Sequence, residues 1–249
     1  MALVFPEIKY YTFDKNFKMM FLKLPSNIFS CNITVEVGSV DEDHSKEEMG
    51  LAHFFEHMIL KGDIDGVSIT ERLDFIGAHY NATTSYIDTN YYISGNNKDY
   101  SFILNSMLQL ILEPQFPQKD IDNERKVVLE EFHMSKDNHG REHLLKTMEL
   151  MYKGIDDKLT IPVIGYEECI VNFTRDKLLK FYDDKYKTKN KIITVIGNVD
   201  EDAIMAIIRQ KFKKVGPWVH NFRPLNKELV IPHHKVINTK MHFMSLPVS

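Results

Sequence analysis

Apolar residues recur along this chain with two periods, every second residue in some stretches and every third or fourth in others. Alternating, β-branched stretches predict strands, and the three-to-four spacing predicts helices with one apolar face. Strands are expected at residues 8–13, 18–24, 31–37, 79–84, 86–94, 192–196 and 229–237. Helices are expected at residues 50–61, 68–77, 99–112, 117–135, 142–152, 174–186 and 201–212. Strands first, then helices, then strand and helix again indicate an α+β fold with a sheet covered by helices.

The helix expected at residues 50–61 has an apolar face and a polar face of unusual composition. Its apolar face consists of Leu51, Phe54, Phe55 and Met58. His53, Glu56 and His57 fall within roughly 100° of one another on the opposite side. Two imidazoles four residues apart can bind one metal ion, and the carboxylate beside them can reach a water on that ion. The order His-x-x-Glu-His is the inverted zincin motif, although an amphipathic helix without a metal could show the same residues.

Two histidines need at least a third protein ligand to hold zinc with a position open for water. In the helix expected at residues 117–135, Glu131 shares a face with Glu124, Val127 and Val128, whereas Glu130 points away. A carboxylate on such an inward face needs a partner. That partner is either a metal ion or a buried Lys or Arg, and the spacing alone leaves both open.

Composition excludes several classes of function. The chain has 249 residues, 31 basic and 35 acidic, with a net charge of −4, which does not support nucleic-acid binding. It has no apolar run long enough to cross a membrane, and its first residues resemble neither a secretory signal nor a transit peptide. Cys31 and Cys169 lie far apart without metal-site spacing, so we expect free thiols in a reducing compartment. A cytoplasmic protein without membrane contact is therefore expected.

Other histidines offer weaker metal sites. The segment His139–His143 also reads His-x-x-Glu-His, but Gly140 and the polar residues before it favour a loop. His133 lies on the far side of its helix from Glu131. His233 and His234 are strand neighbours that point to opposite faces. We therefore expect no metal at these positions.

Several motifs together resemble one family. The run GLAHFFEHMILKG at residues 50–62 looks like the signature of the pitrilysin family, which includes insulin-degrading enzyme and the mitochondrial processing peptidases. Residues 77–84, GAHYNATT, are similar to the family's Gly-x-x-x-Asn-Ala-x-Thr strand. Residues 123–131, NERKVVLEE, are similar to its Glu-Arg-x-Val-Val-x-Glu-Glu helix. The resemblance spans roughly residues 8–245 and implies one domain of a clamshell, with a mixed, mostly antiparallel sheet covered by helices.

The resemblance implies a role for each matching residue. One Zn²⁺ per chain would be bound by His53, His57 and Glu131, and Glu56 would be the general base of peptide hydrolysis. Glu124 would support the site behind the ligands. The substrate backbone would lie along the edge strand at Asn81 and Ala82.

The resemblance also shows a departure, because family members continue into a second homologous half. Residues 1–228 are expected to form the metallopeptidase N-terminal domain, and residues 229–249 the linker and the start of that second half. A partner half, another subunit or a second copy would then complete the site. We expect a zinc endopeptidase that acts on short or unfolded peptides. The alternative is a non-catalytic or structural subunit of a processing-peptidase-like complex.

Overall fold

A computed structural model describes residues 7–64, 66–212 and 216–217. Its main sheet has seven strands in the order β6-β7-β3-β8-β2-β1-β9. Only β2 and β8 pair in parallel among these neighbours, so the expected mixed, mostly antiparallel sheet is confirmed. The strands are β1 Ile8–Thr12, β2 Phe17–Lys23, β3 Ile28–Val35, β6 His79–Thr84, β7 Thr89–Asn96, β8 Lys191–Gly197 and β9 Gly216–Pro217, with a separate hairpin of β4 Asp63–Ile64 and β5 Val67–Ser68.

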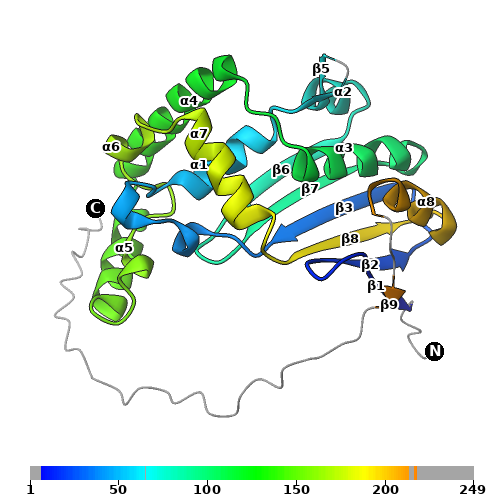
Figure 1. Cartoon of the computed structure of the whole chain (residues 1–249), viewed down its shortest axis with the longest axis horizontal. Coiled ribbons are helices and arrows are strands. Elements are labelled where there is room, and N and C mark those ends of the chain that lie inside the picture. Colours follow the sequence, from blue (N-terminus) through cyan, green and yellow to red (C-terminus); the bar gives the residue numbers. More distant parts are fainter. Residues whose placement is uncertain (1–6, 65, 213–215, 218–249) are drawn as a thin grey trace, which may run out of the picture. The chain divides into compact units, whose positions relative to one another are not determined.

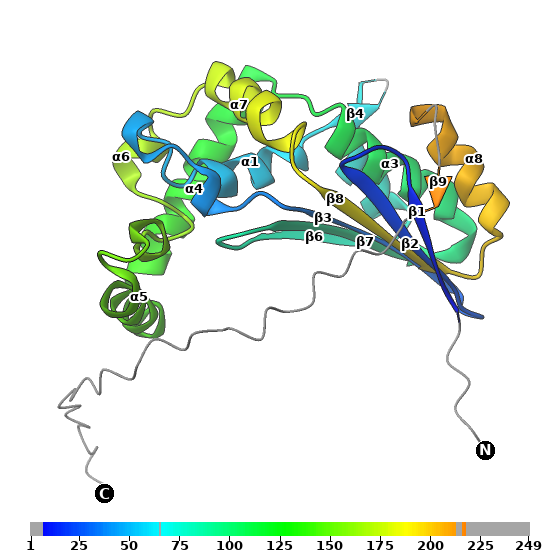
Figure 2. The ribbon, with the colours of Figure 1, turned by 60° about the horizontal axis from the view of Figure 1, so that its bottom comes forward.

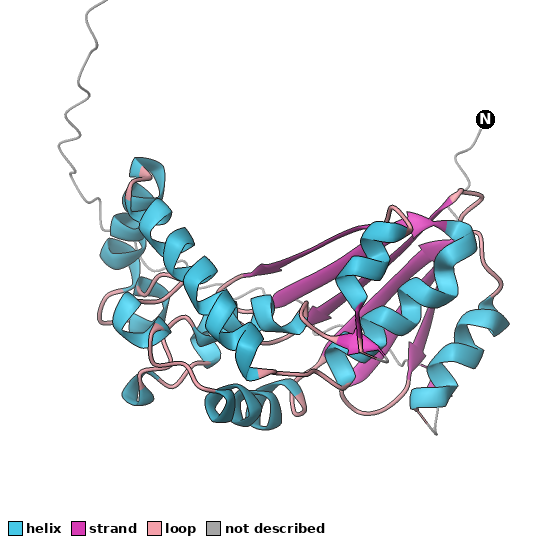
Figure 3. Ribbon diagram, turned by 90° about the horizontal axis from the view of Figure 1, so that it is seen from above, coloured by secondary structure: helices cyan, strands magenta, loops and turns pink. Residues whose placement is uncertain are grey.

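The α-helices of the described residues are α1 Leu51–Ile59, α2 Ile69–Phe75, α3 Tyr100–Leu112, α4 Gln118–Lys136, α5 His139–Tyr152, α6 Glu167–Ile170, α7 Arg175–Phe181 and α8 Glu201–Lys211. Most of the helices gather on one face of this sheet, as the side view in Figure 2 shows, whereas α5 lies past the end of β6 and β7. A π turn, Tyr182–Tyr186, extends α7. In Figure 1, α1 lies between the sheet and α4, and Figure 3, seen from above, shows helices lying over the strands. Of these helices, α3 packs on β7 and β3. The mixed α+β architecture is therefore the expected one.

Alternation along the strands explains why one face of the sheet is covered. In β2, β3 and β8, buried residues alternate with half-buried ones, and the buried set faces the helices. The opposite face carries polar pairs, such as the hydroxyls of Ser30 and Ser94 at 2.9 Å and the bond from Thr34 to Asn90 at 2.6 Å. The helical layer therefore lies on the apolar side of the strands.

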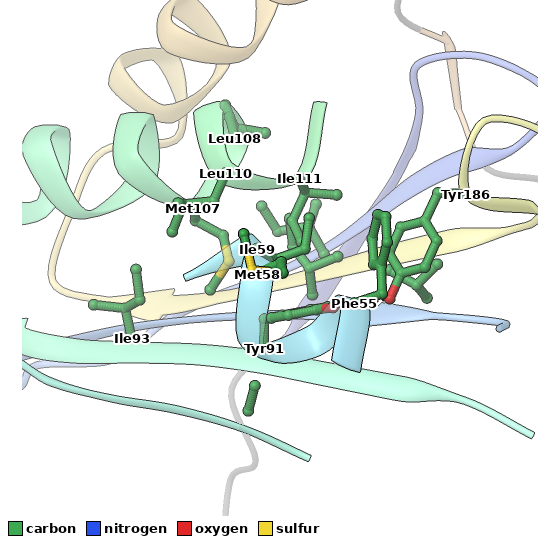
Figure 4. Close-up of a cluster of buried hydrophobic side chains, with 14 of the residues drawn as sticks. Phe55, Met58, Ile59, Tyr91, Ile93, Met107, Leu108, Leu110, Ile111 and Tyr186 are labelled. Carbon is green, nitrogen blue, oxygen red and sulfur yellow. Dashed lines mark hydrogen bonds between the residues drawn. The ribbon is translucent and has the colours of Figure 1, made fainter. Parts of the chain in front are cut away.

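Figure 4 shows how α1 is fixed in this layer. Phe55, Met58 and Ile59 pack among buried residues of α3 and β7. Nearby, the hydroxyls of Tyr91 and Tyr186 lie 2.8 Å apart, so each ring has a partner for its one polar atom. The whole apolar face predicted for α1 is fully buried.

The start of α1 is held by a close backbone contact and a buried carboxylate. Gly50 has φ +93°, and a Cβ built on it would lie 2.3 Å from the carbonyl oxygen of Ile164. The carboxylate of Glu42 accepts the backbone N–H of Gly50 at 3.0 Å and that of Ala52 at 2.8 Å. Burial raises the pKa of Glu42 to about 8, while these two hydrogen bonds favour its charged form. The first turn of α1 is thus held by contacts from residues 42 and 164.

Several expected boundaries are wrong. β3 and β7 are displaced by two or three residues from the predicted strands, because alternation sets the face of a residue but not where pairing stops. α5 begins at His139, not at residue 142, because the side chain of Asn138 caps it by accepting the N–H of Arg141 at 3.1 Å. The helical spacing predicts an inward-facing Val127, but this residue is 46% exposed.

The expected strand at 229–237 and the expected domain boundary at residue 228 fall outside the described residues, so both remain predictions.

Gly50→Ala is expected to lower the free energy of unfolding by about 2 kcal/mol or more, because it adds a backbone clash to an unfavourable positive φ. Gly154→Ala is the matched control: its φ is +78°, but no atom lies within 4 Å of the new Cβ. Urea unfolding of both variants would measure the difference. Equal losses would show that close packing at residue 50 contributes nothing.

Candidate metal centre

Two helices bring the predicted ligands together. α1 presents His53 and His57, whose rings lie 4.8 Å apart between centroids at 70°. From α4, the Oε2 atom of Glu131 lies 3.6 Å from Nε2 of His53 and 3.5 Å from Nε2 of His57. One ligand atom from each of the three residues falls within 4.8 Å of the others. Such a group of two imidazoles and one carboxylate has the composition of a catalytic zinc site.

Glu124 lies behind this group, about two helical turns before Glu131 on α4. Its Oε2 lies 3.2 Å from Nδ1 of His57, and its Oε1 accepts from Nζ of Lys61 at 2.7 Å. A carboxylate on Nδ1 favours the tautomer that carries its proton there, which leaves Nε2 free to bind a metal. Glu124 therefore orients His57 toward Glu131.

Glu56 is buried on the same helix as the two histidines and accepts a hydrogen bond from the hydroxyl of Thr84 on β6. Burial raises the pKa of Glu56 above the usual value, and the bond from Thr84 opposes that rise. Glu56 is not among the three residues whose ligand atoms converge, so its carboxylate lies beside the ligand group and not in it.

The pKa values of the three candidate ligands reflect their crowding. Burial, and then the neighbouring His57, lower the pKa of His53 to about 4. Burial also lowers the pKa of His57, but its hydrogen bonds with Glu124 and Glu131 outweigh burial and raise it to about 9. The hydrogen bond with His57 lowers the pKa of Glu131. Charged Glu131 and neutral His53 are both suited to a cation, whereas His57, whose raised pKa favours its charged form, must release a proton when it binds a metal ion.

The donor set fits zinc in number and in kind. Three groups with convergent nitrogen and oxygen atoms match the number of protein ligands that leaves one position open. The remaining nitrogen of His57 has its carboxylate, as ligating histidines usually do. Nδ1 of His53 is buried and has no hydrogen-bond partner among the described residues. The residues present therefore fit zinc. The ring of His57 is oriented by a carboxylate, whereas the ring of His53 has no such hydrogen bond in the described residues.

A cavity of about 820 Å³ lies over the ligand group and follows the outer edge of β6. Asn81 and Ala82 both line it. Among the described strands, β6 pairs only with β7, so its other edge is open. The side chain of Asn81 accepts the backbone N–H of Ala82 at 2.8 Å. An extended peptide could pair with this open edge as an added strand of the sheet, and its backbone could then accept the N–H of Ala82 in place of the Asn81 side chain.

Three residues of the site are not singled out by the sequence pattern. Thr84 enters only as part of the strand motif, and Lys61 only as part of a helix stop. Arg141 lines the cavity, but the sequence favours a loop for its segment. Asn138, followed by the helical apolar spacing of Leu144, Met148 and Met151, is the signal that could have revealed it.

The other histidines considered as metal ligands that the structure describes lie apart from the centre, whereas His233 and His234 fall outside the described residues. His133 is exposed and lies 3.8 Å from Glu167. His139 and His143 are exposed at the start of α5, so their literal motif forms no metal group in the described residues. Both cysteines are free and buried, as expected for unpaired thiols.

Comparison with known proteins assigns this fold and centre to a family of peptidases. The profile of the insulinase family (peptidase family M16) matches residues 20–158, which include every residue of the centre. The profile of the peptidase M16 inactive domain matches residues 172–242. The chain therefore belongs to the insulinase, or M16, peptidase family.

Similar proteins in this family are named as proteases. An uncharacterized zinc protease of Rickettsia felis is 33% identical over 186 residues, which are 74% of this chain and 44% of that protein. One from Rickettsia bellii is 30% identical over 88% of this chain and 52% of its own length. The ferredoxin protease FusC, solved as a point mutant in complex with Arabidopsis ferredoxin, is 26% identical with a TM-score of 0.75, covering 88% of this chain and 25% of that one. The chain thus spans about half the length of the curated relatives it matches.

Across the residues that the structure describes, no helix combines the length and apolarity that a membrane span requires.

Glu131→Gln is expected to reduce zinc binding strongly, because an amide replaces the one charged ligand. His133→Gln on the same helix is the control, since that exposed imidazole lies outside the group. Zinc per chain, measured by elemental analysis after dialysis, compares the two. Full zinc content in Glu131→Gln would rule out this carboxylate as a ligand.

Glu124→Gln is expected to weaken zinc affinity by about 10- to 100-fold, the usual loss when the carboxylate behind a ligating histidine is removed. Glu130→Gln removes the same charge from an exposed position of α4. Competition with a fluorescent chelator would give both affinities. Equal affinities in the two variants would mean that Glu124 serves only as the partner of Lys61.

Proposed function

We propose that this chain carries the active centre of a zinc endopeptidase, with His53, His57 and Glu131 as ligands and Glu56 as general base. The observation that carries the proposal is the convergence of three donor atoms beside a separate, buried carboxylate. The names of the zinc protease relatives support the same class.

The residues of the chain divide the chemistry among them. When bound, zinc polarises a peptide carbonyl and lowers the pKa of a water. Glu56 accepts a proton from the attacking water and returns it to the leaving amine. Thr84 holds the carboxylate of Glu56 toward the cavity, and the raised pKa of Glu56 lies nearer to neutral pH, where proton transfer in both directions is efficient. Glu124 keeps His57 in the ligating tautomer.

The substrate of this proposal is a peptide in extended form. A strand added at Asn81 and Ala82 would pair through its backbone, which carries little sequence information. The cavity over β6 gives room for its side chains on the metal side. Short or unfolded segments fit this geometry, because their backbone groups are free to pair with the edge of β6.

We also propose that a second half, a partner subunit or a second copy of the chain completes the site. The chain covers 44% and 52% of two similar zinc proteases, so those proteins contain roughly as much sequence again. The alternative function is a non-catalytic or structural subunit. Against it stands the complete donor set with its base, because a subunit without activity has no need for Glu56 beside the ligands.

Glu56→Gln is expected to retain one zinc per chain and to lose peptide hydrolysis by a factor of about 100 or more, because the amide cannot accept the proton. Glu130→Gln serves as the control for charge. Zinc analysis and cleavage of quenched fluorescent peptides measure the two properties separately. Hydrolysis at the control's rate would rule out Glu56 as the base.

The central experiment follows cleavage of a peptide mixture by the zinc-loaded chain, with products identified by mass. Cleavage that depends on Glu56 would support an active centre that works in this length of chain. No cleavage with zinc bound would point to the need for a second half, and the same assay would be repeated with a longer protein. No zinc and no cleavage in either form would overturn the proposal.

A further inference from the structure

Arg141 is a positively charged residue in the cavity wall to which the proposed mechanism assigns no role. It lies in the first turn of α5, half-buried, and lines the cavity together with Gly140 and Leu144 of the same helix. Asn138 caps this turn and so fixes the backbone from which the guanidinium extends. An arginine in the wall of a substrate cavity, on a capped helix, is positioned to bind a ligand anion.

The other charges around the cavity already have partners. Lys61 pairs with Glu124 at 2.7 Å, and Glu131 lies against the two histidines. Within the part of the chain that the structure describes, no carboxylate forms an ion pair with Arg141. Arg141 lines the same cavity as His53, His57 and Glu131. Arg141 is thus near the centre and able to take a ligand.

The two cations lie toward opposite ends of β6. Burial raises the pKa of Tyr80, near the start of the strand, and Lys61 opposes that rise. Burial also raises the pKa of Tyr86, just past the end of the strand, and there Arg141 opposes it. Figures 1 and 2 show α5 beside the turn that joins β6 to β7, in agreement with this placement. Between the two ends, Thr84 contacts Glu56 of the centre.

A peptide on the open edge of β6 would therefore pass the metal centre and then Arg141. In an extended strand, successive residues advance about 3.3 Å and alternate in direction. A residue one or two positions from the scissile bond would point its side chain toward α5. A glutamate or aspartate there would form the ion pair that Arg141 lacks in the described residues.

We propose that Arg141 determines substrate specificity by binding a carboxylate of the peptide close to the scissile bond. This inference rests on the proposed peptidase function and adds to it a class of substrate, namely peptides with an acidic group on the α5 side. The carboxylate can be an acidic side chain or the C-terminus of a short peptide, because a guanidinium binds both in the same way.

A second role for Arg141 must be separated from this one. Its charge reaches both Glu131 and His53, so it could act on the metal site alone. A residue with only that role would change zinc affinity and would treat acidic and neutral peptides alike. A residue that binds substrate changes the ratio between two peptides that differ by one carboxylate.

The first test measures binding and does not need hydrolysis. Zinc-loaded Glu56→Gln protein is titrated with fluorescent peptides that differ only by Glu or Gln at one position, each with a free or an amidated C-terminus. We expect about tenfold tighter binding of one acidic peptide, as for one charge-assisted hydrogen bond in a half-open site. Adding Arg141→Gln should bring the ratio to about one, and Arg141→Glu should favour a Lys peptide instead.

Lys146→Gln is the matched control, since it removes one positive charge from an exposed position of α5 outside the cavity. It should leave the acidic preference as in the parent protein. The amidated peptides separate the two sources: a preference that survives amidation belongs to the side chain, and one that disappears belongs to the C-terminus. In active protein, the ratio of kcat/KM for the same peptide pairs should follow the binding ratio.

Two results would overturn the inference. The parent protein could bind acidic and neutral peptides equally, or Arg141→Gln could keep the acidic preference while its zinc affinity changes. Either result leaves the peptidase proposal intact, because that proposal depends on Glu56 and the ligands. Conversely, a chain that binds acidic peptides through Arg141, but neither binds zinc nor cleaves peptides even as part of a longer protein, would overturn the peptidase proposal alone.

Discussion

The structure of this centre depends on one short helix, α1. One side of this helix is buried in the core, and the other carries His53, Glu56 and His57. α1 has only nine residues, and a helix of that length is marginal by itself. Its apolar face is fully buried against the sheet and α3, and its first turn is held by Gly50 and Glu42. Because packing fixes the rotation of α1, both imidazoles point to the same side and meet α4 there.

The second constraint is the charge gathered at that contact. Glu56, Glu124 and Glu131 lie around two imidazoles in a partly buried site, and burial works against every charged form. The groups are kept in place by specific partners: Lys61 for Glu124, Thr84 for Glu56 and His57 for Glu131. Burying this many acidic oxygens together is costly for a fold, and a cation bound to them would offset that cost. Metal affinity and local stability should therefore be linked in this protein.

Membership of the M16 family accounts for the residues of the centre. The open edge of β6 and Arg141, which lie beside the centre, are observed in the structure of this chain. The M16 profile covers the residues from the metal helix through α5. The chain spans about half the length of the curated relatives it matches, and the edge of β6 beside the centre is open in the described residues. Beside that edge, Arg141 adds a charge that lies in a helix turn capped by Asn138. In the function that we propose, chemistry and substrate choice rest on separate elements, α1 with α4 for the first and α5 with β6 for the second.

The sequence by itself determined the α+β class, most of the elements, and the identity of the residues that converge at the centre. It could do so because periodicity reports which face of an element is buried, and because His53 and His57 belong to one helix, where spacing defines geometry. It did not place Val127, the start of α5 or the cavity role of Arg141, and Glu131 needed the family resemblance to be preferred over an ion pair. Only the tertiary structure decided these, because the distance between α1, α4, α5 and β6 depends on how the helices pack on the sheet. No local spacing records the contact between Thr84 and Glu56 or the side on which Arg141 lines the cavity along β6.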